Sequence, residues 1–356
     1  MRLFSCGTCG SVVHFDSRTC LVCNSRLGFS PDRMAMLGLP AQANDATPDG
    51  GSDGRWRLCA NAGHGACNWL VCEEAEGGEG TYCVACRHDR TIPDLSVEQN
   101  LTAFRKVLAA RALLFYSLLR WHLPAPTLAD APDTGLTFDF LAATKRPDGK
   151  AQPVMTGYAA GLITLAIDEA DDSEREARRT ALAESYRTLL GHFRHESGHY
   201  YWERLVRDGG RLDEFRAQFG DERQDYAAAL AANYDEGPPA DWQSRHVSPY
   251  AACHPSEDFA ETWAHYIHIV DSLETAFAFG MSTAPKGAAG NQLAAEVTQS
   301  PYESASVHEL VDAWVPLTIA VNALNRSMGL PDLYPFVLSD MIVAKLAFVH
   351  RLVHPA

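Results

Sequence analysis

Two pairs of cysteines, each in the pattern Cys-x-x-Cys, stand ten residues apart near the start of the chain, at Cys6 and Cys9 and at Cys20 and Cys23. Each pair can direct two sulfurs toward one point, and four thiolates complete the tetrahedral coordination of a zinc ion with no open position. A bound metal also lets a segment with few apolar side chains fold. We therefore predict a zinc ribbon over residues 1–40 that holds one structural zinc ion.

A second group of potential zinc ligands follows, with more members than a four-ligand site needs. Its members are Cys59, Cys67, Cys72, Cys83, Cys86 and the nearby His64. The last two cysteines form a Cys-x-x-Cys pair, and we pair Cys59 with Cys67, which leaves Cys72 as the spare. The alternative in which Cys72 or His64 replaces one of the four stays open. In a reducing compartment such cysteines indicate metal ligands rather than disulfides, so we expect a second structural zinc ion.

At 356 residues the chain is too long for one small core, and its character changes near Pro93. Nine of the ten cysteines precede that point, and long helical patterns follow it. Residues 41–55 are rich in glycine, aspartate, proline and alanine, which is typical of a flexible linker. The sequence therefore predicts a ribbon (1–40), this linker, a second zinc-binding unit (56–92) and a large domain (93–356).

The large domain is predicted to mix strands with a majority of helices. Apolar residues at helical spacing predict a long helix over Leu95–His122. Residues 136–141 and 162–167 have the apolar, β-branched character of strands. An acidic first turn opens one continuous helix from Ser173 to about Val206. We also expect a mobile surface segment at 281–300 and helices at about 304–328 and 336–352, which gives an α+β, helix-rich fold.

The formal net charge of −15 restricts the partners of the chain. Binding nucleic acid requires a cationic surface that neutralises phosphates, so this balance argues against nucleic acid as a partner. The first residues contain no signal-peptide core, and no apolar run reaches the roughly 18 residues of a membrane span. We therefore expect a cytoplasmic protein without a membrane partner, and the sequence leaves its oligomeric state open.

The pattern His-Glu-x-x-His occurs in the predicted helix as His195-Glu196-Ser197-Gly198-His199. Histidines four residues apart lie on one face of a helix, so both imidazoles can reach one metal ion while Glu196 lies beside it. The sequence therefore predicts a catalytic zinc site with two histidine ligands.

Two further carboxylates stand four residues apart in a later helical stretch, at Glu257 and Glu261. In zinc peptidases of the gluzincin type, a second helix supplies a glutamate as third ligand, and a carboxylate one turn later holds a ligand histidine through its other ring nitrogen. We assign Glu257 as the third ligand and Glu261 as the supporting carboxylate. The reversed assignment is the alternative.

Three ligands leave a fourth position for a water molecule, which zinc activates. Glu196 is then the predicted general base. Tyr250, seven residues before Glu257, is the predicted donor to the oxyanion because a phenol stays neutral at working pH. His246 and His254 compete for that role, although we favour structural positions for them. Structural roles are also expected for a further set: His192, Cys253, His265, His268, Tyr200, Tyr201 and Trp202.

These motifs together resemble a known family. The layout FSCGTCG, then CNWLV, YCVACRHDRTIPDLS, HFRHESGHYYW and EDFAETWAHYIHIVD is similar to bacterial zinc-binding metallopeptidases with an N-terminal zinc-ribbon region. The resemblance covers essentially the whole chain. It implies a zincin-like catalytic domain and hydrolysis of peptide bonds.

A more distant likeness is to the catalytic domain of anthrax lethal factor. There an HExGH helix is followed by a tyrosine and, seven residues later, by a metal-binding glutamate in a Phe-Ala-Glu context. Tyr250, Glu257 and Phe259-Ala260-Glu261 match that spacing. This likeness supports Glu257 over Glu261 as the ligand.

Three functions compete at this point. The first is a zinc-dependent peptidase acting on an intracellular protein or peptide, with the ribbons recruiting or gating the substrate. The second is a non-catalytic interaction module, against which Glu196 argues because binding alone needs no general base. The third is a protease recruited to nucleic acid by its ribbons, which the acidic charge disfavours.

Overall fold

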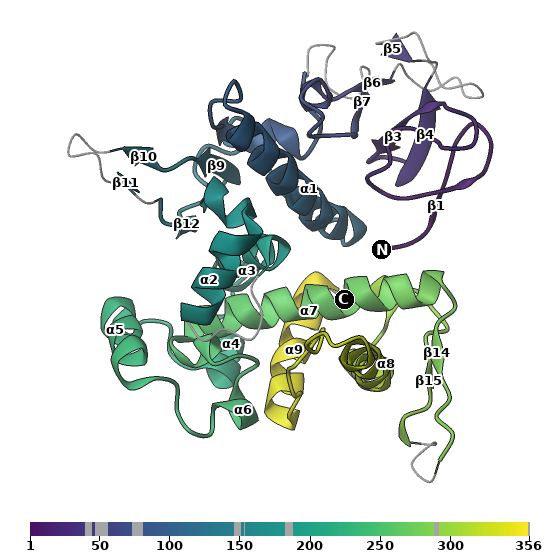
Figure 1. The fold of residues 1–356 in the computed structure, drawn as a ribbon. Coiled ribbons are helices and arrows are strands. Elements are labelled where there is room, and N and C mark those ends of the chain that lie inside the picture. The colour runs from purple at the N-terminus through teal and green to yellow at the C-terminus, as the bar shows by residue number, and fades with distance from the viewer. Residues whose placement is uncertain are drawn as a thin grey trace. The chain divides into compact units, whose positions relative to one another are not determined.

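The computed structural model describes residues 1–39, 45–46, 56–72, 81–145, 151–152, 154–181, 188–287 and 292–354 (Figure 1). The chain divides into two compact units. One is Leu3–Glu176, and the other is Ala177–Ala356 together with Met1–Arg2. Most of the predicted linker 41–55 lies outside the described residues.

The cysteine-rich part of the first unit consists of short antiparallel strands. These are β1 (Phe4–Ser5) with β2 (Val12–Val13), β3 (Arg26–Ser30) with β4 (Ala35–Leu39), and the ladder of β5 (Asp45–Ala46), β6 (Trp56–Leu58) and β7 (Leu70–Cys72). The two cysteine-rich segments are joined directly, because Phe29 of β3 makes a parallel bridge to Trp69. A side-chain bond from Asn68 Nδ2 to the carbonyl oxygen of Phe15 (2.7 Å) adds to this junction.

An aromatic cluster forms the core beneath the first ribbon. Phe15 and Phe29 have ring centroids 4.8 Å apart, and Trp69 lies 4.8 Å from Phe29. Tyr116, from the long helix α1 (Glu98–Arg120), lies 5.4 Å from Phe15. Burial of these large rings compensates for the small number of apolar side chains in the ribbon itself.

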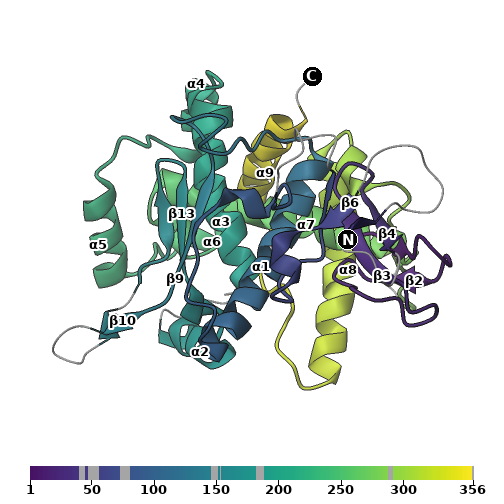
Figure 2. The same cartoon turned by 90° about the horizontal axis from the view of Figure 1, so that it is seen from above.

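A four-stranded sheet completes the first unit, in the order β12 (Gly157–Ala159), β13 (Leu162–Ala166), β9 (Thr137–Leu141) and β8 (Asp89–Thr91). Strands β8, β9 and β13 are parallel, whereas β12 is antiparallel to β13. Figure 2 shows β9 and β13 beside each other. The predicted helix at Leu95–His122 and both predicted strands are confirmed.

Other short elements of this unit are β10 (Thr144–Lys145), which pairs with β11 (Ala151–Gln152), and the 3-10 helices η1 (Ala60–Ala62), η2 (Cys86–His88) and η3 (Ile167–Ala170). The helix α2 (Asp172–Ala181) follows them.

The prediction of one helix from Ser173 to about Val206 is wrong. A separate helix, α3 (Leu189–Tyr201), begins after Thr188, whose backbone is extended and whose side-chain oxygen accepts from the backbone nitrogen of Gly191 (2.9 Å). This is an N-cap, which starts a helix and does not continue one. The helical chain past Tyr201 widens into a π-helical turn, η4 (Trp202–Arg207).

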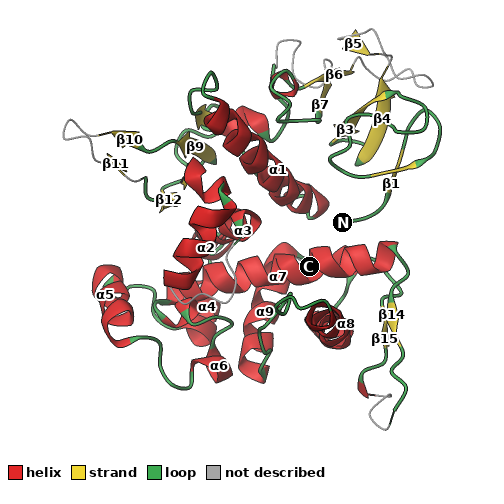
Figure 3. Cartoon of the chain, viewed as in Figure 1, coloured by secondary structure: helices red, strands yellow, loops and turns green. Residues whose placement is uncertain are grey.

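Helices make up most of the second unit (Figure 3). After η4 come α4 (Leu212–Phe219), α5 (Tyr226–Glu236), α6 (Trp242–Arg245), the 3-10 turn η5 (Tyr250–Ala252), α7 (Pro255–Ala278), η7 (Pro301–Glu303), α8 (Val307–Ser327) and α9 (Asp340–Val353). The long helix α7 packs against α3, α4, α8 and α9. Helices α8 and α9 confirm the two C-terminal helices predicted at about 304–328 and 336–352. The predicted α+β, helix-rich class is confirmed as well.

The core of this unit is built around the buried face of α7. Trp263 stacks on Tyr201 of α3, with ring centroids 5.0 Å apart, and donates from Nε1 to Ser197 Oγ (3.1 Å). Phe259 lies against Phe219 at 5.6 Å. The expected packing role of Tyr201 is therefore confirmed, and α3 and α7 are held together by both apolar and polar contacts.

The described residues 281–287 and 292–300 follow α7, and their strands project from its end (Figure 1). A short antiparallel ladder of β14 (Ser282–Thr283) and β15 (Ala295–Glu296) forms among them, which the sequence did not indicate. These residues are mostly exposed, in agreement with a surface segment. Among the described residues, no helix is long and apolar enough to span a membrane.

Candidate metal centre

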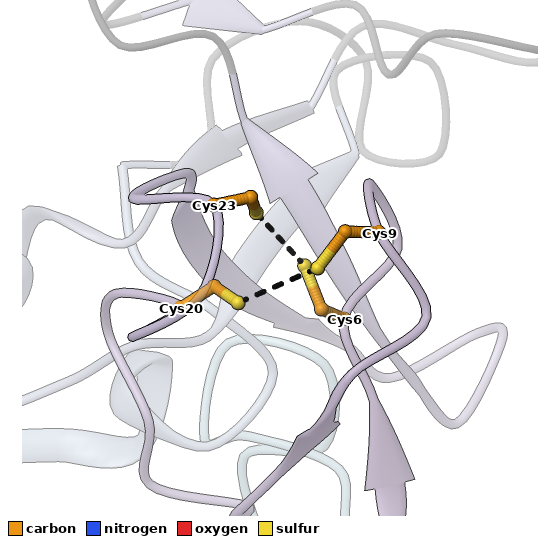
Figure 4. Close-up of side chains that lie close together, drawn as sticks. All are labelled: Cys6, Cys9, Cys20 and Cys23. Atoms are coloured by element: carbon orange, nitrogen blue, oxygen red, sulfur yellow. Dashed lines mark hydrogen bonds between the residues drawn. The ribbon is translucent and has the colours of Figure 1, made fainter.

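The first four cysteines bring their sulfurs together at one point (Figure 4). The sulfurs of Cys6 and Cys23 are 3.7 Å apart, as are those of Cys9 and Cys20. A metal–sulfur bond of about 2.3 Å in a tetrahedron places neighbouring sulfurs about 3.8 Å apart. All ten cysteines are free, so these distances belong to thiols and not to disulfides. The four side chains fit a zinc ion.

The two Cys-x-x-Cys turns of this cluster repeat one hydrogen-bond pattern. In the first, the nitrogen of Gly10 donates to the oxygen of Cys6 (2.9 Å), and in the second that of Asn24 donates to the oxygen of Cys20 (2.9 Å). Both Gly10 (φ 75°) and Asn24 (φ 57°) have left-handed backbone conformations, which glycine and asparagine adopt most readily. The turn geometry is therefore encoded in the residue that follows each pair.

The second cluster consists of Cys59, Cys67, Cys83 and Cys86, all of them buried. The sulfurs of Cys67 and Cys83 are 3.8 Å apart, which again matches a tetrahedral zinc site. Cys72 lies in β7 and, like His64, does not belong to this group. The structure thus brings together the four cysteines that the sequence favoured.

A buried arginine lies against the second cluster, and sequence reasoning did not identify it. Arg111 of α1 is 1% exposed, donates from Nη2 to the sulfur of Cys86 (3.0 Å) and forms an ion pair with Asp89. A zinc ion with four thiolates carries a net negative charge, so this guanidinium compensates a charge that is removed from water.

The predicted catalytic residues meet where α3 packs on α7. His195, His199 and Glu257 each offer one atom to a common point, with all three atoms within 4.8 Å of one another. The close approach of the helices depends on Gly198, since a Cβ there would lie 2.8 Å from the Cα of Ala260 on α7. The small residues at these two positions therefore let the ligand-bearing faces meet.

The ring of His195 is oriented by a carboxylate. Its Nδ1 lies 2.6 Å from Oε1 of Glu261, and the second oxygen of Glu261 accepts from Ser248 Oγ (2.6 Å). Burial opposes ionisation of Glu261, but the His195 hydrogen bond outweighs it and lowers the pKa of Glu261 to about 2. With Nδ1 occupied, Nε2 is the nitrogen of His195 that faces the metal position.

Glu257 is 2% exposed, and its two oxygens have different surroundings. Oε1 accepts a hydrogen bond from the hydroxyl of Tyr226 (2.9 Å). Oε2 lies 3.0 Å from Nε2 of His195 but has no hydrogen-bond partner among the described residues. A buried carboxylate oxygen without a donor is costly, and a cation at this point would remove that cost. The three residues therefore fit a zinc ion.

Glu196, the predicted base, and Tyr250, the predicted oxyanion donor, both interact with the His195, His199 and Glu257 group. Glu196 is 9% exposed, and burial raises the pKa of its carboxyl group. The ring of Tyr250 lies 6.0 Å from that of His195. Burial, followed by the Glu257 carboxylate and the Tyr226 hydroxyl, raises the pKa of Tyr250, so its phenol keeps its proton.

The two histidines that competed with Tyr250 make structural contacts. His246 Nδ1 lies 3.2 Å from Oδ2 of Asp258, a carboxylate that also accepts from Lys345. His254 caps α7, since its Nδ1 accepts from the backbone nitrogen of Ser256 (3.1 Å). Neither belongs to the metal-binding group.

Two further residues that were expected to be structural are also explained by their surroundings. His265 is buried with Nδ1 2.7 Å from the hydroxyl of Tyr334. Burial raises the pKa of Cys253 to about 11, which is unsuited to a thiolate nucleophile. His192 and His268 also lie outside the metal-binding group.

Two protein-family models together match almost the whole length of the chain. The model of the family described as "Putative zinc-binding metallo-peptidase" matches residues 100–352. The chain belongs to this family. A second model, a zinc-ribbon domain, matches residues 3–97, the part that holds both four-cysteine clusters. The family therefore confirms the resemblance seen in the motifs.

Similar members of the family occur in mycobacteria. An uncharacterized protein of Mycobacterium tuberculosis and one of Mycobacterium bovis are each 39% identical to this chain, over 99% of its length and 95% of theirs. No solved structure gives a significant match, so the likeness to lethal factor rests on the short motif alone.

Proposed function

We propose that this chain is a zinc-dependent metallopeptidase that hydrolyses peptide bonds of an intracellular protein or peptide through a zinc-activated water. The main support is Oε2 of Glu257, a buried acceptor without a donor that faces Nε2 of His195. Two imidazoles approach this carboxylate, since Nε2 of His199 also lies 3.5 Å from its Oε1. A cation bound at Oε2 would compensate the removal of this oxygen from water.

His195 and His199 would hold zinc through their Nε2 atoms, and Glu257 through Oε2. Zinc, when bound at such a site, supplies Lewis acidity that lowers the pKa of a water to about 7. Glu261 keeps the ring of His195 in the orientation that presents Nε2.

The remaining steps belong to Glu196 and Tyr250. The Glu196 carboxylate accepts a proton as water oxygen adds to the carbonyl carbon of the substrate. It then passes that proton to the amine nitrogen as the carbon–nitrogen bond breaks. Tyr250 donates a hydrogen bond to the oxygen that becomes negative. The electrostatic influence of His195 and His199 on Glu196, and the 6.0 Å between the rings of Tyr250 and His195, support these roles.

The two four-cysteine clusters would hold two structural zinc ions, so that the chain carries three in total. Sulfur separations of 3.7 to 3.8 Å support this assignment. We propose that the ribbon region recruits or gates a protein substrate, since neither cluster has an open coordination position for chemistry.

The test is cleavage of fluorescently labelled casein by the wild type and by Glu196→Gln. The substitution keeps shape and leaves all three ligands, so zinc content should be unchanged while cleavage falls by at least about 100-fold. Glu98→Gln, the same change at an exposed glutamate on α1, is the control and should cleave at the wild-type rate. If Glu196→Gln cleaved as fast as the wild type, Glu196 would not be the general base, and a wild type that bound zinc but cleaved nothing would make the site a binding module and not a peptidase.

A further inference from the structure

Tyr226 is a second phenol at the metal-binding group, and no motif in the sequence indicated it. It is the first residue of α5, whose N-cap is Asp225, the side chain of which accepts from the nitrogen of Ala228 (3.0 Å). No residue of α5 is buried, and Tyr226 itself is 43% exposed. Its position is therefore not explained by packing into a core.

The backbone before Tyr226 is tied to the start of α7 by His254. The Nδ1 atom of this histidine accepts from Ser256, so Nε2 carries the proton and donates to the carbonyl oxygen of Gln224 (3.3 Å). The His254 ring also meets the Tyr226 ring edge to face, with centroids 5.3 Å apart. His254 thus caps α7, the helix that carries Glu257, and also contacts Tyr226, which hydrogen-bonds to Glu257.

The hydroxyl of Tyr226 uses its proton on Oε1 of Glu257, at 2.9 Å. A carboxylate can rotate about its last bond and present either oxygen, or both, to a cation. A donor fixed on Oε1 restrains this rotation and leaves Oε2 3.0 Å from Nε2 of His195, whereas Nε2 of His199 lies 3.5 Å from Oε1. The hydrogen bond therefore restrains the carboxylate and favours Oε2, which lacks a donor among the described residues, as the oxygen that binds the metal.

We propose that Tyr226 is a positioning residue of the metal centre, which holds Glu257 as a one-oxygen zinc ligand. This inference rests on the proposed function. Partners of this kind are commonly worth a factor of 10 to 100 in metal affinity. Tyr226 acts on the metal through Glu257, whereas Tyr250 acts on the substrate. Excess zinc should consequently restore the cleavage rate when Tyr226 is replaced, but not when Tyr250 is replaced.

The experiment compares wild type, Tyr226→Phe, Tyr250→Phe and Tyr82→Phe by competition for zinc with a fluorescent chelator, starting from protein that keeps its two cysteine-bound ions. Tyr82, also 43% exposed, is the matched control and lies in the other unit. We expect Tyr226→Phe to bind the third zinc about 10 to 100 times more weakly. Tyr250→Phe and Tyr82→Phe should bind it as the wild type does.

Casein cleavage at a series of zinc concentrations gives the second readout. Excess zinc should return Tyr226→Phe close to the wild-type rate, whereas Tyr250→Phe should stay slow at every zinc concentration. Equal zinc affinities for the wild type and Tyr226→Phe would overturn this inference and leave the proposed function standing. A wild-type protein without a third zinc ion would overturn both.

Discussion

Gly198 of α3 lies directly against Ala260 of α7, the second helix of the metal-binding group. A Cβ atom on Gly198 would lie 2.8 Å from the Cα of Ala260, closer than real Cβ atoms come to any backbone atom. Gly198 directly precedes His199 in α3, and Ala260 directly precedes Glu261 in α7. The distance between the ligand-bearing faces is therefore set by the absence of one side chain.

Gly198→Ala should separate α3 from α7 because the new methyl group meets backbone and cannot be accommodated by a rotamer change. We expect a loss of about 1 to 3 kcal/mol of unfolding free energy and loss of the third zinc ion. Denaturant unfolding and metal content per chain measure these effects. Gly157→Ala, where a Cβ has nothing within 4 Å, is the control. A Gly198→Ala protein with wild-type zinc content would show that helix spacing does not control the site.

Glu257→Gln and Glu261→Gln should differ, because the first removes the proposed ligand and the second only changes the partner of His195 Nδ1. We expect Glu257→Gln to lose the third zinc ion, and Glu261→Gln to bind it about 10 to 100 times more weakly. Metal analysis and chelator competition distinguish these results. The reverse order would make Glu261 the ligand, as in the alternative assignment from the sequence.

The two four-cysteine clusters should release zinc at different rates. In the first, Cys9 is exposed and Cys23 is half-buried, whereas all four cysteines of the second are buried. A mercurial reagent must reach the sulfur, so zinc release should occur in two phases. Cys9→Ala should remove the fast phase only. A single phase, or a fast phase that survives Cys9→Ala, would contradict this prediction.

Arg111→Met should destabilise the first unit and the second cluster together. The substitution leaves the carboxylate of Asp89 buried without its cation and removes the donor to Cys86. Breaking such a buried pair costs about 3 to 5 kcal/mol. Denaturant unfolding, followed together with zinc release, measures the loss. Arg105→Met, at an exposed arginine of the same helix, should have little effect. Equal stabilities of the two variants would show that Arg111 does not stabilise the first unit or the second cluster.

Several features of the site were predictable because they depend on neighbours in the chain. The four-residue spacing of His195 and His199 places both on one face of any helix. The Cys-x-x-Cys turns are likewise local, and the structure groups the cysteines that the sequence paired. The prediction of a continuous helix from Ser173 is wrong for a local reason as well, since Thr188 is an N-cap and starts a new helix. Domain boundaries and catalytic roles stay predictions.

The sequence by itself determined which residue types could bind metal, and the helical or turn spacing that groups them in pairs. Tertiary structure alone decided which distant groups complete each site. Tyr226 precedes Glu257 by 31 residues, and Arg111 follows Cys86 by 25, with no spacing rule connecting either pair. Burial is the physical reason. A carboxylate or a thiolate needs a particular donor only once folding has removed it from water, and the fold determines which donor lies within reach.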